Sequence, residues 1–273
     1  MRGMILSICL LTTVIMHAQE LYVYSEPASN MAARSLGVRL QNNLMLPKSG
    51  GATEYSLLPE IMLGVSRKIM LHADAILTDR TNRFKAAGGG VYVKYRFFSA
   101  DDVHSHFRMA CFGRVTRNNG PVLDNTINLQ QQNSGAELGL IATRLKNKVA
   151  ISLSASWLRA SDNKNNEGIG YDVYRNKALA ASLSVGKLML PKVYEDYRQV
   201  NLNAMVELLG QVGQTNPGLD KNNYLDLVPS LQLILLSKVR VELGYRFPLI
   251  NNTDRIFDRS FLLRAEYNFF NLF

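Results

Sequence analysis

Residues 261–273, the last thirteen of the chain, read Phe-Leu-Leu-Arg-Ala-Glu-Tyr-Asn-Phe-Phe-Asn-Leu-Phe. Taken at alternate positions, they divide into two sets of opposite character. The first set is apolar or aromatic and the second is charged or polar: Phe261, Leu263, Ala265, Tyr267, Phe269 and Phe273 against Arg264, Glu266 and Asn268. Side chains of a β-strand alternate between two faces with a period of two. We therefore predict a strand with one face toward an apolar medium and the other toward water.

The chain ends at an aromatic residue, Phe273. An alternating apolar row that closes on Phe resembles the C-terminal strand by which outer-membrane barrels are recognised for insertion. The resemblance implies that this strand contacts the barrel-assembly machinery. A soluble edge strand with the same alternation is the alternative.

The N-terminus has the features of a secretory signal peptide. Arg2 supplies a positive charge, residues 4–16 are apolar, and the small residue Ala18 lies at a polar boundary. The apolar core is shorter than the about 20 residues that span a bilayer as a helix, and no stop-transfer segment follows it. We therefore expect residues 1–19 to be removed on export, with cleavage after Ala18 or after Gln19.

The exported chain is basic and has a single cysteine. Without Arg2 it carries 30 basic and 22 acidic residues, so its net charge is 30 − 22 = +8. A surplus of this size suits lipid phosphates or nucleic acid, and export argues against nucleic acid. Cys111 remains alone once Cys9 is lost with the signal peptide, so no intramolecular disulfide is expected.

Several further stretches alternate in the same way, and no stretch after the signal peptide has 18 consecutive apolar residues. Because only helices and closed barrels span a bilayer, the sequence predicts an all-β fold: a transmembrane antiparallel up-and-down β-barrel over residues 35–273. Alternation places twelve strands. Their predicted ranges are 35–46, 55–65, 68–77, 89–98, 107–115, 136–145, 149–157, 178–185, 200–209, 225–236, 239–247 and 261–273.

The lengths of the connections give an independent indication of topology. Long polar segments follow the odd-numbered strands, for example residues 117–134, whereas tight turns follow the second, sixth and tenth strands. Outer-membrane barrels have long external loops, short periplasmic turns and usually an even strand number. We therefore predict a barrel in the cell outer membrane with both termini in the periplasm. A soluble sandwich or lipocalin-like barrel, the alternative, would have an apolar interior.

The inward positions of the predicted strands carry charges of both signs in nearly equal number. The predicted lumen-lining residues are Arg39, Lys94, Arg96, Arg108, Arg114, Arg240, Arg246 and Arg264 against Glu60, Asp74, Glu137, Glu207, Asp226, Glu242 and Glu266. A strongly ion-selective pore lines itself with one sign. The near balance instead predicts ion pairs across the lumen.

The positive surplus therefore belongs to loops and turns. Six basic residues are expected to face outward there: Lys48, Arg80, Arg83, Lys85, Arg117 and Lys164. They are candidates for contact with outer-membrane lipid and with the phosphates of lipopolysaccharide. Solvated loop charges without a partner are the alternative.

One turn has the composition of a weak metal site. Asp101, Asp102, His104 and His106 lie close together, and carboxylate and imidazole groups bind divalent transition metals. The spacing matches no established motif, and polar turn residues are the alternative. We expect no cofactor.

His72 and Asp74 share the inner face of the third strand, which allows an imidazole–carboxylate pair for acid–base chemistry. A nucleophile is required as well, and Ser152, Ser154 and Ser156 are candidates only by default. Because no histidine is predicted beside a serine, we do not expect an enzyme.

Residues 20–34 precede the barrel and contain Leu21, Tyr22, Val23 and Tyr24 close together. The motif Ser-Glu-Pro-Ala-Ser-Asn-Met at residues 25–31 resembles the mature start of uncharacterised outer-membrane β-barrel proteins of Bacteroidetes. The resemblance extends to residues 94–108 and, more loosely, to the whole chain. It implies a fold and a location but no activity. The segment is expected to be a periplasmic leader or a small plug in the lumen.

These observations favour a narrow channel or small-solute transporter, because transport is the commonest task of such barrels. A non-conducting structural or surface-interaction barrel is the second possibility, and a lipid-modifying barrel enzyme is the third. The sequence does not identify a solute.

Overall fold

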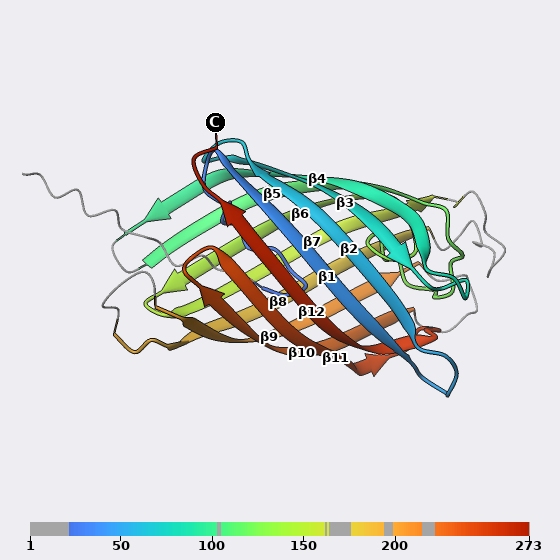
Figure 1. The fold of residues 1–273 in the computed structure, drawn as a ribbon. Coiled ribbons are helices and arrows are strands. Elements are labelled where there is room, and N and C mark those ends of the chain that lie inside the picture. The colour runs from blue at the N-terminus through green and yellow to red at the C-terminus, as the bar shows by residue number, and fades with distance from the viewer. Residues whose placement is uncertain are drawn as a thin grey trace, which may run out of the picture.

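The computed structural model describes residues 22–102, 105–161, 163, 176–193, 199–214 and 222–272. Within them, twelve antiparallel strands form one closed barrel, in which each strand pairs with its neighbours in sequence and β1 pairs with β12 (Figure 1). The strands are β1 (Ser35–Pro47), β2 (Glu54–Gly64), β3 (Ile69–Thr78), β4 (Lys85–Asp101), β5 (Ser105–Asn118), β6 (Ser134–Lys146), β7 (Val149–Ser161), β8 (Lys177–Leu190), β9 (Asn201–Gly213), β10 (Asn223–Leu235), β11 (Val239–Asn251) and β12 (Phe257–Phe269). This architecture confirms the predicted up-and-down barrel.

The two faces of the barrel have opposite character. On β7, Ile151, Leu153 and Trp157 are exposed on the outside, whereas Ser152 is buried inside. The same alternation holds on the other strands, so the outer face is apolar and the inner face is polar. A soluble barrel would have the reverse arrangement, and an apolar outer face is stable only in lipid. The chain is therefore a transmembrane barrel.

No helix among the residues that the structure describes is long and apolar enough to cross a membrane.

The strand ends differ from the predicted ones. β8 continues to Leu190 although the apolar pattern fades after Val185, because backbone hydrogen bonds to β9 persist. Conversely, Val65 and Lys68 lie in the turn between β2 and β3, and Leu236 lies in a turn with a positive φ of 52°. β12 ends at Phe269 instead of at the terminus. Phe273 and the predicted signal peptide lie outside the described residues.

The two prolines inside strands occupy interruptions in the ladders. Pro59 pairs with Leu40 of β1, but no partner on β3 is paired with it. Pro229 pairs with Val206 of β9 and likewise has no paired residue on β11. Proline lacks the amide hydrogen that a ladder needs, and each barrel wall accommodates it by breaking one ladder for two residues.

The start of β1 and the C-terminal end of the described chain lie at one end of the barrel. Leu272 donates a backbone hydrogen bond to Arg34 (3.0 Å), just before β1 begins. The tight turn between β6 and β7 is at this same end, where Asn147 has a φ of 55°, a conformation that asparagine tolerates well. The connection between β5 and β6, by contrast, is long and lies at the opposite end.

Candidate functional site: the barrel lumen

The structure directs the charged residues predicted for the lumen into the barrel. Most are buried, namely Arg39, Glu60, Asp74, Lys94, Arg108, Arg114, Glu207, Asp226, Arg240, Glu242, Arg264 and Glu266. Arg96, Glu137 and Arg246 are half-buried. A charge in such a position needs a partner, because an unpaired buried ion is strongly destabilising.

The largest ion-pair network surrounds Arg39 on β1. Its guanidinium lies 2.9 Å from a carboxylate oxygen of Glu60 on β2 and 2.9 Å from one of Glu266 on β12. Glu266 also pairs with Arg240 on β11. On the other side, Nδ1 of His72 lies 2.7 Å from Glu60. The network thus joins five strands on one side of the lumen.

A separate network lies farther from the chain termini. The carboxylate of Asp226 on β10 accepts hydrogen bonds from Arg246 (2.7 Å) and, from two nitrogens, Arg255 (2.8 and 2.9 Å). Arg255 belongs to the connection between β11 and β12, so strand alternation gave no signal for it. It is nevertheless buried, and its guanidinium stacks 4.3 Å from the ring of Tyr224.

The N-terminal segment, residues 22–31, lies inside the barrel, and its backbone is bound by Glu207 of β9. The carboxylate accepts hydrogen bonds from the backbone amides of Val23 (2.7 Å), Tyr24 (3.0 Å) and Ser25 (2.9 Å). The Ser25 hydroxyl donates a further bond of 2.7 Å. Hydrogen bonds to an ionised carboxylate are about twice as strong as neutral ones. Glu207 is therefore the main anchor of this segment.

Basic side chains bind the carbonyl groups of the same segment. Arg264 donates to the carbonyls of Tyr22 (2.6 Å) and Val23 (2.9 Å). Lys94, whose side chain is fully buried, donates to the carbonyls of Pro27 (2.8 Å) and Ser29 (2.9 Å). These contacts come from β12 and β4, on different sides of the barrel, so the segment crosses the lumen.

Glu26 is the acidic residue of the N-terminal segment. Its carboxylate lies 3.2 Å from Arg39 and 3.4 Å from Lys94. Burial alone would raise the pKa of this carboxyl, but the charges of Lys94 and Arg39 outweigh burial and hold the pKa well below its ordinary value. Glu26 therefore joins the segment to the Arg39 network as an anion.

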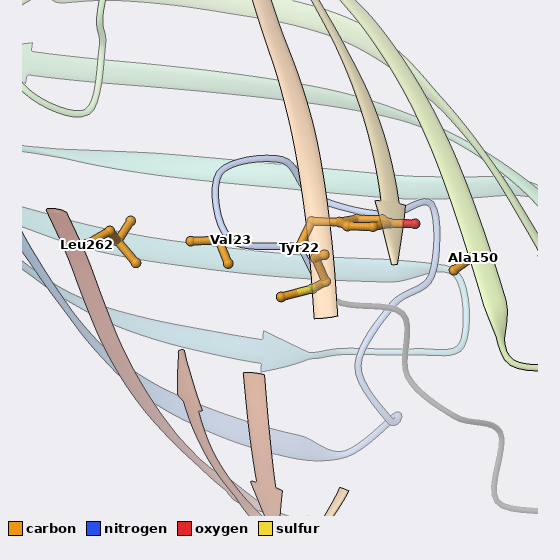
Figure 2. Close-up of a cluster of buried hydrophobic side chains, with 5 residues drawn as sticks. Tyr22, Val23, Ala150 and Leu262 are labelled. Atoms are coloured by element: carbon orange, nitrogen blue, oxygen red, sulfur yellow. The ribbon is translucent and has the colours of Figure 1, made fainter. Parts of the chain in front are cut away.

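Apolar side chains complete the docking. Tyr22 and Val23 are buried with Ala150, Met205 and Leu262, which are inward-facing residues of β7, β9 and β12. Figure 2 shows Val23 directed toward Leu262 and the ring of Tyr22 directed toward Ala150. The close spacing of apolar residues at the start of this segment in the sequence indicates such packing.

The connection between β5 and β6 also folds into the barrel. Ile127 and Leu129 of this inner loop, residues 119–133, pack against the inward residues Leu158 and Ala160 of β7. The side-chain amide of Gln211 on β9 bonds to both the amide and the carbonyl of Ile127 (2.9 Å each). The long connection lies at the end of the barrel opposite the chain termini, where an external loop is predicted, but these residues fold inward over the lumen.

Two polar residues tie the inner loop to neighbouring connections. Asp124 accepts a hydrogen bond of 2.7 Å from the amide of Ile256, and burial raises the pKa of its carboxyl. Arg80 donates to Glu54 (2.7 Å) and to the carbonyl of Pro121 (3.3 Å). Arg80 was expected to face outward, but the carboxylate of Glu54 draws it inward, where its side chain is buried.

A cavity of about 240 Å³ lies between the N-terminal segment and the inner loop. Tyr24, Ser25 and Glu26 line it from one side and residues 126–131 from the other. Its walls carry both charges and hydroxyls, contributed by Arg114, Glu137, Ser154, Ser156, Ser182, Arg246 and Asp258 among others. Such a surface can hydrogen-bond a small polar solute of either charge.

The proposed metal ligands do not form a cluster in the described residues. Asp101 accepts a bond from Arg108 (3.0 Å) and another from the hydroxyl of Ser99 (2.9 Å), and His106 is directed inward on β5. Asp102 is exposed, and His104 lies outside the described residues. No group of three or more potential ligands occurs among the residues that the structure describes.

The residues considered for acid–base chemistry are likewise separated. His72 bonds to Glu60, whereas Asp74 pairs with Arg114 (3.0 Å). The hydroxyls of Ser152, Ser154 and Ser156 bond to Thr143, Ser182 and Glu137, respectively. In the described part of the chain, His72 thus has no hydrogen bond to a serine.

Comparison with solved structures agrees with this fold. An outer membrane channel from Pseudomonas putida F1 matches with a TM-score of 0.60 at 12% sequence identity, over 91% of this chain and all of that one. The NanC porin matches with a TM-score of 0.49 at 11% identity, over 85% of this chain and 98% of that one. No protein-family model matches, and no curated protein matches either. The fold is that of an outer-membrane β-barrel, and its apolar outer face places the chain in that membrane.

Proposed function

We propose that the protein is a narrow outer-membrane channel for small polar solutes, and that the docked N-terminal segment holds it closed. The observation that carries this proposal is the polar cavity between the segment and the inner loop. A barrel needed only as a structural element does not need a polar cavity, because apolar packing fills an interior more stably than buried charges do. The similarity of the fold to an outer membrane channel supports the same function.

The balance of charge in the lumen argues for weak ion selectivity. The cavity wall presents Arg114 and Arg246 together with Glu137 and Asp258, so neither sign prevails. Selective pores line their constrictions with one sign. The expected solutes are therefore small polar molecules whose passage depends more on size than on charge.

The test is conductance in planar bilayers, with the full mature chain and a variant lacking residues 22–31. We expect a small conductance from the full chain and a clearly larger one from the variant. Circular dichroism and heat-dependent gel migration would show that both are folded. If a folded variant conducts no better than the full chain, the proposal fails. If the deletion does not fold, Glu207→Gln, which keeps the segment but weakens its anchor, serves instead.

A non-conducting structural or surface-interaction barrel is the second candidate, and the filling of the lumen by residues 22–31 favours it. A lipid-modifying enzyme is a third candidate with no site to support it among the described residues. Absence of conductance from every folded variant would favour the second candidate.

We also propose that the chain belongs to the outer-membrane barrel proteins of Bacteroidetes. The stretch Ser25 to Met31 supports this assignment, and in this chain it supplies much of the segment that crosses the lumen.

A further inference from the structure

The outer face of the barrel has a large hollow in its apolar surface. Its volume is about 1080 Å³, slightly above the range of about 300–1,000 Å³ typical of ligand pockets. The hollow spans β4 to β10, and no charged residue lines it. Four outward positions with short side chains lie in it: Gly113, Ala155, Ala181 and Gly210.

Larger apolar side chains form the walls of this hollow. Trp157 and Leu179 are directly paired across β7 and β8, and both are exposed on the outer face. Tyr95 on β4 and Leu225 on β10 stand at its two sides. The indole of tryptophan is typical of the boundary between hydrocarbon and headgroups. Trp157 thus indicates that the hollow ends near that boundary.

Two cations lie immediately beyond this boundary. Arg159 lies two residues after Trp157 on β7, and Lys177 lies two residues before Leu179 on the antiparallel β8, a distance of roughly 7 Å in each case. They are paired directly with each other and are exposed. Within the described residues neither side chain has a hydrogen-bond or ion-pair partner. Like charges directly opposite each other destabilise a sheet, so an anion bound between these two cations would stabilise the pair.

A third cation stands on the same side. Arg117 on β5 is exposed and lies four residues beyond Gly113 in the direction of the long connections. Topology places these connections outside the cell, because both termini and the tight turns are at the other end. The cations therefore border the outer leaflet.

We propose that this surface binds lipid A, the phosphorylated, multiply acylated glycolipid anchor of lipopolysaccharide. The acyl chains occupy the hollow, and the phosphates bridge Arg159, Lys177 and Arg117. Charge complementarity and the position of the cations directly beyond an apolar hollow carry the assignment. The site is independent of whether the lumen conducts.

The test is lipid binding by the purified full chain in detergent, measured by native mass spectrometry. The probes are lipid A, dephosphorylated lipid A and phosphatidylglycerol. In the double variant Arg159→Gln/Lys177→Gln, affinity for lipid A should fall at least about tenfold, since each basic group near a membrane surface contributes about 1 kcal/mol. The matched control is Arg144→Gln/Lys187→Gln, which removes two exposed cations from the opposite end of the same wall. This control should bind lipid A normally.

A second variant tests the hollow. Gly210→Leu adds a side chain there, and the nearest atoms to a new Cβ are 3.6 Å away, an ordinary contact distance. It should weaken lipid A binding without unfolding the barrel. Unchanged affinity in the Arg159/Lys177 variant overturns the proposal. So does equal binding of dephosphorylated lipid A, and so does tighter binding of phosphatidylglycerol, which would assign the site to a phospholipid.

Discussion

Two residues of the same charge on the inner face of the barrel can have different roles. Glu207 and Glu137 are both inward acidic residues, but Glu207 binds three backbone amides of the N-terminal segment whereas Glu137 bonds to Ser156. Only the first is positioned to control docking.

Replacing Glu207 should therefore release the segment. In Glu207→Gln one carboxylate oxygen becomes an NH₂ group, which cannot accept the hydrogen bonds that Ser25 donates. Docking of the segment should therefore become less favourable by about 1.5–3 kcal/mol. The expected result is more frequent opening in planar bilayers. Glu137→Gln is the control and should leave the closed state unchanged. Equal behaviour of the two variants would contradict the role of Glu207.

Glu26 makes docking sensitive to acid. Its pKa is lower in the docked segment than in the released one, whose value is about 4.3. The ionised Glu26 therefore stabilises the docked state fully at pH values above about 4.3, and this stabilisation is lost as the pH falls below that value. We expect channel opening to increase as pH falls below about 4. Glu26→Gln should show a shallower pH dependence, and an unchanged profile would show that Glu26 is not responsible.

At the scale of the strand, β7 presents the sharpest contrast between adjacent positions. Ala155 is exposed on the outer face, and Ser154 is directed inward. Ala155→Arg should destabilise the barrel because it exposes a charge to lipid, by less than the roughly 2–4 kcal/mol that applies at the midplane, whereas Ser154→Arg should be tolerated. Unfolding in detergent or lipid, followed by tryptophan fluorescence, measures the difference.

Side-chain location provides the decisive control. In a Cys111→Ala background, a cysteine at Ala155 should be quenched by lipid-borne probes, and a cysteine at Ser154 should not. Equal quenching at the two positions would show that the inward and outward assignments of β7 are wrong.

The strands could be predicted from the sequence because lipid on one side and a polar interior on the other impose a strict period of two. The inward path of the inner loop could not be predicted in this way. Its many Asn and Gln residues are typical of an external loop, and only the isolated Ile127 and Leu129 signalled burial. The pairing of Glu207 with Val23 joins residues 184 positions apart, and no local pattern specifies such a contact. Strand alternation predicted that Glu207 faces inward, but it could not predict which residues Glu207 binds.

At the scale of the whole molecule, the topology predicts how the barrel is oriented in the membrane. A protease site inserted at Gly50, which is exposed in the connection between β1 and β2, should be cut from outside intact cells. A site at Asn147, in the turn at the opposite end, should be cut only after the cells are permeabilised. The reverse result would invert the topology and would also place Arg159 and Lys177 at the wrong leaflet.

The pair of Arg39 and Glu266 joins the first strand to the last, so it exists only when the chain is complete. A chain that stopped before β12 would enclose Arg39 with one carboxylate fewer and leave Arg240 without Glu266. An uncompensated buried charge costs about 3–5 kcal/mol. Sealing of β1 against β12 therefore does two things at once: it closes the backbone ladder and it completes the charge compensation of Arg39 and Arg240.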